Sequence, residues 1–128
     1  MLRTALAALI FTVGAAGITH AEGMRFHEAI AHHGVRAQVD ELLGEQPAWV
    51  AFVLDRGGVE GKPITLTLED QDYEFYPTCR PHECEMKKIG LLIGDDGSTY
   101  VRLYGAQTED QIFGDPPAKV AEALAAQE

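Results

Sequence analysis

The only two cysteines of the chain, Cys79 and Cys84, enclose four residues with a histidine among them. A bond between them would close a loop of six residues. By restricting the unfolded chain, a disulfide that closes so small a loop stabilises the folded domain by only about 2 kcal/mol. The bond would therefore fix the shape of the loop more than it would hold a domain together. The enclosed residues, which are candidates for a functional site, are Arg80, Pro81, His82 and Glu83.

The N-terminus has the layout of a secretory signal. Arg3 supplies positive charge, residues 5–16 are almost wholly apolar, and Thr19-His20-Ala21 offers small residues for cleavage. The apolar run is shorter than the roughly 20 residues that span a bilayer. We therefore expect a signal peptide over residues 1–21 and no membrane attachment after cleavage. Cleavage after Ala16 and a buried N-terminal helix are the alternatives. In an exported chain, two cysteines are expected to form a disulfide.

The remaining residues, 22–128, fit a single domain with one modest core. Removal of Arg3 leaves 9 Lys+Arg, from 10, against 20 Asp+Glu, which is a formal charge of −11. Such a surface repels nucleic acid and anionic lipid and attracts a basic protein. The charge therefore argues against a nucleic-acid partner.

Two ends of the chain have helical patterns. Apolar residues recur at helical spacing from Met24 to Leu43, and Gly34 divides this segment, with the second helix over 35–43. The pair Pro116-Pro117 predicts the start of a final helix. Between these ends we expect five strands, at residues 47–54, 64–69, 73–76, 86–93 and 100–104.

These elements predict an α+β fold with a five-stranded, mostly antiparallel sheet and helices packed on one face. The segment from Cys79 to Cys84 then connects two neighbouring strands. A rigid scaffold commonly presents a functional loop at such a position.

The residue patterns for catalysis or metal binding fit poorly. Cys79, His82 and Cys84 lack a second pair of ligands for structural zinc, and four intervening residues do not match the C-x-x-C of a thiol oxidoreductase. His27, Glu28 and His32 resemble a zincin helix with one residue too many, so we interpret His27, His32 and His33 as a solvated helix face. We expect no enzyme, no cofactor and no metal.

Two motifs carry a specific likeness. The segment Cys79–Cys84 resembles the C-K-P-H-D-C loop of the Ivy family, the periplasmic inhibitors of vertebrate (c-type) lysozyme. Pro47-Ala48-Trp49-Val50 looks like the P-A-W-V element of that family. Arg80 replaces a lysine and Glu83 an aspartate, and both substitutions keep the charge.

The resemblance implies an Ivy-like fold, a periplasmic location and lysozyme as the partner. The loop would enter the cleft of the enzyme, where His82 would meet the catalytic carboxylates and Arg80, Pro81 and Glu83 would make flanking contacts. Some members of the family are dimers, so a homodimer is compatible with the sequence. Two other functions stay open: control of an endogenous lytic transglycosylase by the same loop, and a periplasmic metal- or ligand-binding module that uses His82 and the helix histidines.

Overall fold

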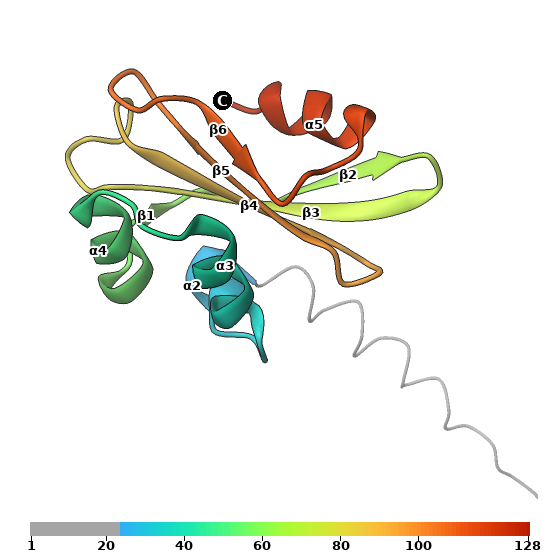
Figure 1. Ribbon diagram of the computed structural model, residues 1–128, viewed down its shortest axis with the longest axis horizontal. Coiled ribbons are helices and arrows are strands. Elements are labelled where there is room, and N and C mark those ends of the chain that lie inside the picture. The colour runs from blue at the N-terminus through green and yellow to red at the C-terminus, as the bar shows by residue number, and fades with distance from the viewer. Residues whose placement is uncertain (1–23) are drawn as a thin grey trace, which may run out of the picture.

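The computed structural model describes residues 24–128, which form a six-stranded antiparallel sheet with helices on both faces (Figure 1). The expected signal peptide, residues 1–21, lies outside the described residues. The helices are α2 (Phe26–Ile30), α3 (Val35–Leu43), α4 (Ala48–Arg56) and α5 (Ala118–Ala125). The strands are β1 (Val59–Glu60), β2 (Ile64–Leu68), β3 (Gln71–Cys79), β4 (Lys88–Gly94), β5 (Thr99–Tyr104) and β6 (Gln111–Phe113).

The sheet is five positions wide, in the order β1-β3-β4-β5-β6, and all of its pairs are antiparallel. The long strand β3 shares one edge between two partners: β2 pairs with residues 71–75 and β1 with residues 78–79. The predicted α+β class with an antiparallel sheet is confirmed. The connection between β3 and β4 contains both cysteines, as the sequence predicted.

The two faces of the sheet carry separate cores. Helices α2, α3 and α4 pack on one face, where the sheet contributes Tyr76, Ile89, Leu91, Val101 and Leu103. Helix α5 packs on the other face. The sequence predicted helices on one face, and α5 departs from that placement because β4 is apolar on both sides. The buried residues of this second core are Tyr73, Phe75 and Leu92 from the sheet and Val120 and Leu124 from α5.

The second of the two N-terminal helices, α3, begins and ends as predicted, whereas α2 ends at Ile30, four residues before Gly34. Gly34 has φ 80° and Gly44 has φ 61°, so the two glycines take left-handed conformations that other residues rarely adopt, and they bound α3. At the other end of the chain, α5 follows Pro117.

The strand predicted at residues 47–54 is wrong, because this segment is the helix α4. Its buried residues Val50, Val53 and Leu54 follow helical spacing, whereas Ala51 and Phe52 between them are exposed. A short apolar run without charges does not distinguish a strand from a buried helix, and the residues that it packs against decide the outcome.

Candidate functional site

The loop between β3 and β4 is closed at its base by a disulfide. Cys79 is the last residue of β3, and its Sγ is bonded to that of Cys84, with 4.8 Å between the two Cα atoms. The backbone N–H of Arg80 donates to the carbonyl of Lys87 at 3.0 Å, which continues the β3–β4 pairing for one more step. The loop therefore leaves the sheet from a fixed base.

His82 stands at the tip of a tight turn. The N–H of Glu83 donates to the carbonyl of Arg80 at 2.9 Å, with Pro81 and His82 as the two central residues. The φ of His82 is 69°. Proline at the second position and a positive φ at the third position define a type II turn, and histidine is among the residues that enter the left-handed region most often. The turn leaves the imidazole exposed to solvent.

Glu83 holds the loop together from inside. Its carboxylate accepts hydrogen bonds from the guanidinium of Arg80 and from the ammonium group of Lys87, so one oxygen faces each cation. The hydrogen bond from Lys87, followed by the positive charge and hydrogen bond of Arg80, lowers the pKa of Glu83. The three residues form an internal ion-pair group that spans the loop, and Glu83 is thereby engaged within the loop.

Helix α4 and strand β1 lie against one side of the loop. The guanidinium carbon of Arg80 is 5.9 Å from the centroid of the Phe52 ring. The carbonyl of Val59 accepts a hydrogen bond from the hydroxyl of Thr78 at 3.3 Å, and the Sγ of Cys79 lies 3.5 Å from the same oxygen. The chain next to Val59 passes so close that a Cβ on Gly58 would lie 2.3 Å from the carbonyl oxygen of Cys79.

The segment 105–108 supports the other side. Ala106 N–H donates to the carbonyl of Glu85 at 2.9 Å, and Gln107 N–H donates to that of Met86 at 3.2 Å. The hydroxyl of Thr108 also donates to the carbonyl of Met86, at 2.8 Å. These bonds hold the backbone of Glu85 and Met86, between Cys84 and the start of β4, to the segment 105–108.

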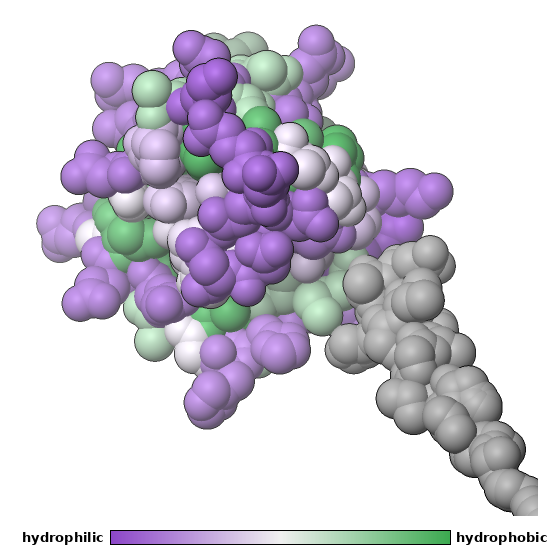
Figure 2. Space-filling model, turned by 90° about the vertical axis from the view of Figure 1, so that its right-hand side faces the viewer, coloured by the Kyte–Doolittle hydropathy of each residue, from purple (hydrophilic) through white to green (hydrophobic). Residues whose placement is uncertain are grey.

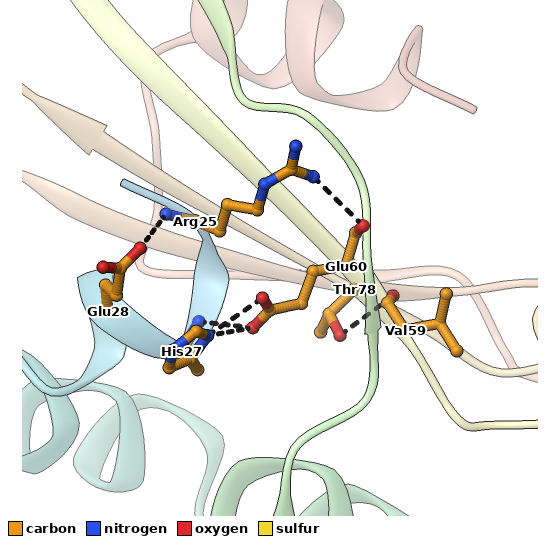
Figure 3. A network of polar contacts seen from close by, with 6 residues as sticks. All are labelled: Arg25, His27, Glu28, Val59, Glu60 and Thr78. Carbon is orange, nitrogen blue, oxygen red and sulfur yellow. Dashed lines mark hydrogen bonds and ion pairs between the residues drawn. The ribbon is translucent and has the colours of Figure 1, made fainter. Parts of the chain in front are cut away.

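The histidines of the first helix are separate from this loop. Figure 3 shows His27 facing Glu60 of β1: its Nδ1 lies 2.9 Å from both carboxylate oxygens, and its backbone N–H donates to Oε2 at 2.7 Å. The hydrogen bond and charge of Glu60 raise the pKa of His27. His32 and His33 are exposed. Across residues 24–128, no three His, Cys, Asp or Glu side chains are placed to hold a metal ion.

A groove of about 630 Å³ separates α2 from the end of α4, with His27 and Glu60 on its wall. His32 and His33 are exposed, but they lie in the turn between α2 and α3 and not on a helix, so the prediction of a helix face is wrong for them. His27 lies on α2 and is exposed, and it also connects that helix to the sheet. No local pattern predicts this contact, because 33 residues separate its two partners.

All four predicted site residues lie within the disulfide loop, where His82 is exposed and Arg80, Pro81 and Glu83 are partly buried. Lys87 and Phe52, which contact the loop from inside and from α4, were not predicted. The spacing of four residues between Glu83 and Lys87 is a signal that could have identified the first.

None of the helices in residues 24–128 is long and apolar enough to cross a membrane. Figure 2 views the molecule from the side that Figure 1 shows on its right. That surface is mostly hydrophilic, with small and scattered apolar areas.

Comparison with known proteins found a distant similarity to lysozyme inhibitors. No family model matches the chain. Two proteins named "Inhibitor of vertebrate lysozyme", from Escherichia coli strain K12 and from Escherichia coli O157:H7, are each 29% identical to it over 63 residues. The matched region is 49% of this chain and 38% of each relative. The chain is thus distantly similar to an inhibitor of vertebrate lysozyme over about half of its length.

Proposed function

We propose that this protein is a periplasmic inhibitor of c-type lysozyme that inserts the loop Cys79–Cys84 into the cleft of the enzyme. The observation that carries the proposal is His82, an exposed imidazole at the tip of a turn that is fixed at its base, its middle and its sides. The distant similarity to inhibitors of vertebrate lysozyme supports the same target. The protein then acts as an inhibitor of an enzyme and not as an enzyme.

The chemistry of the target suits an imidazole. Lysozyme is a retaining glycosidase with two catalytic carboxyl groups, which in this class lie about 5 Å apart. Protonated histidine donates from both ring nitrogens, so one ring between the two groups can donate to each of them. In that position His82 would exclude the substrate from the catalytic centre.

The charge of the loop fits this role as well. Residues 79–88 contain three basic residues and two acidic ones, a balance of +1, in a domain whose formal charge is −11. The acidic domain attracts a basic enzyme over long range, while the local positive charge matches carboxylates at short range. Arg80, Pro81 and Glu83 contribute by contacting the rim of the cleft and by holding the turn.

Restriction of the loop supports tight binding. A loop that is already ordered loses less conformational entropy when it enters a cleft than a flexible one does. The disulfide and the type II turn act within the loop, and the bonds from residues 105–108 hold Glu85 and Met86, which follow Cys84. The backbone that carries His82 is therefore restricted on both sides of the turn.

The variant His82→Asn tests the proposal. Asparagine tolerates the left-handed conformation, so the turn should form and the melting temperature should stay that of the wild type. A hydrogen bond to a charged group contributes about 1.5–3 kcal/mol, so loss of the imidazole should raise the inhibition constant for lysozyme by at least about tenfold. The assay is inhibition of cell-wall lysis by purified lysozyme, with the exported mature protein.

An inhibition constant for His82→Asn equal to that of the wild type would refute the role of the loop tip. If the wild type fails to inhibit lysozyme at all, the proposed target is wrong. The same pair of proteins should then be assayed against a lytic transglycosylase, because the loop would act on that enzyme in the same way.

A further inference from the structure

We propose that the exposed face of α4, centred on Phe52, is a second contact region for the protein whose cleft receives the loop. This inference rests on the proposed function, and it adds a partner-binding surface outside the disulfide loop. The partner is a basic protein, and the part of it that would contact α4 is the outer wall of its cleft.

Phe52 is unusual in its exposure. Its side chain is 43% exposed, and in residues 24–128 the only other large hydrophobic side chains this exposed are Val59 and Ile64. Those two lie at the edge of the sheet on the face of α5. Ile64 pairs with Phe75, which belongs to the core under that helix, and Val59 pairs with Cys79, which lies four residues further along β3 and thus on the same face. On the other face of the sheet, which α2, α3 and α4 cover, Phe52 is therefore the one large apolar side chain in residues 24–128 that is exposed.

The surface around Phe52 is continuous with the loop. The guanidinium of Arg80 lies over the Phe52 ring, 5.9 Å from its centroid, and the same guanidinium pairs with Glu83. Figure 1 shows α4 and the connection between β3 and β4 at the same end of the molecule. A protein that encloses His82 at the tip thus meets α4 next.

The loop alone is too small to form a stable complex. Each side of a standard protein interface contributes about 800 Å² from about 20–30 residues, and the disulfide encloses only four. More surface must take part, and phenylalanine and arginine are both enriched in protein interfaces relative to the rest of the surface.

The composition of α4 favours a protein partner. Its exposed residues Ala48, Ala51 and Phe52 carry no charge, and its two charged residues stand at the C-terminal end. One of them, Asp55, already pairs with Arg36 at 2.8 Å. The first two turns therefore offer a neutral, partly apolar face with little to desolvate, bordered by an acidic domain that attracts a basic partner.

The test compares Phe52→Ala with the matched control Ile64→Ala, which removes an equally exposed apolar side chain far from the loop. We expect Phe52→Ala to raise the inhibition constant for lysozyme by about tenfold, as for a residue at the centre of an interface. Ile64→Ala should leave it within about twofold, since scattered contacts contribute little. Equal inhibition constants for the two variants, beside a wild type that inhibits, would overturn this inference and leave the proposed function standing.

A second variant separates direct contact from an effect through Arg80. Combined with Arg80→Met, the change Phe52→Ala should still weaken inhibition, because the ring itself touches the partner. If Phe52→Ala has no further effect in that background, Phe52 serves only to orient Arg80 and the contact region is refuted. As an independent check, Ala48→Arg places a bulky cation one helical turn from Phe52 and should weaken inhibition at an unchanged melting temperature. Absence of any weakening would also contradict the proposal.

Discussion

Removal of the disulfide by the double change Cys79→Ala and Cys84→Ala should affect both stability and inhibition, by amounts that can be calculated. Closing a loop of six residues restricts the unfolded chain by about 2 kcal/mol. Unfolding entropy is about 2.1 cal/mol/K per residue, which for the 105 residues from 24 to 128 gives about 0.22 kcal/mol/K. The melting temperature should therefore fall by about 9 °C.

The effect on inhibition has an upper limit set by the same free energy. If the loop lost all of its order in the free protein, binding would have to restore it, and 2 kcal/mol corresponds to a loss of about thirtyfold. The backbone bond between Arg80 and Lys87 and the ion pairs of Glu83 remain in the variant. We therefore expect a smaller loss, about tenfold.

Kinetics identify the cause of that loss. A loop that is competent for only part of the time reduces the apparent affinity by that fraction, so the double variant should associate more slowly and dissociate at the wild-type rate. Surface plasmon resonance against immobilised lysozyme measures both rates. The control is reduced wild-type protein, which should behave as the double variant does, whereas reductant should not change the variant itself. A double variant with wild-type association would show that the bond does not preorganise the loop.

Two further changes test other parts of the structure. Glu83→Gln should weaken the ion pairs with Arg80 and Lys87 and weaken inhibition several-fold at pH 7. Because the pKa of Glu83 is lowered, the ion pairs of the wild type should be complete above the usual carboxyl pKa of about 4.3. They should be lost as the pH falls through the lowered value. An inhibition constant for the Gln variant equal to that of the wild type would contradict this role. Leu124→Ala truncates a side chain of α5 that has 0% exposure and should lower the free energy of unfolding by about 2–5 kcal/mol, measured by urea denaturation, with the inhibition constant of the folded protein unchanged. A change in inhibition there would mean that the two faces of the sheet are coupled.

Local signals in the sequence predicted those elements whose ends are marked. Glycines at 34 and 44 and a proline at 117 act through their own backbone geometry, which does not depend on distant residues. The predicted alternation in β2 likewise follows from one half-buried face, where Leu66 and Leu68 are partly covered. The prediction failed for α4, because its apolar run is compatible with either a buried strand or a buried helix. It also missed β6, three residues long, which exists through its pairing with β5.

In the candidate site, too, the contacts between sequence neighbours could be predicted and those between distant residues could not. The cysteines, the proline and the histidine of the loop are adjacent in the sequence, so their association could be predicted without a structure. The cation–π contact between Arg80 and Phe52 could not, because it joins residues 28 positions apart and depends on α4 being a helix. The link between His27 and Glu60 depends in the same way on how α2 packs against β1.

The arrangement of charge within the loop explains why a single histidine can act as its contact point. Arg80, Glu83 and Lys87 satisfy one another, so the cost of removing their charges from water on binding is partly met by pairs that already exist. In residues 24–128, His82 has no side-chain hydrogen bond of its own, and the residue is exposed at the tip of a tight turn. Both of its nitrogens are therefore free for the partner. A cleft that offers two acceptors to one ring can gain both bonds without first breaking any bond of the inhibitor, and this favours a pair of carboxyl groups over a single charged group as the target.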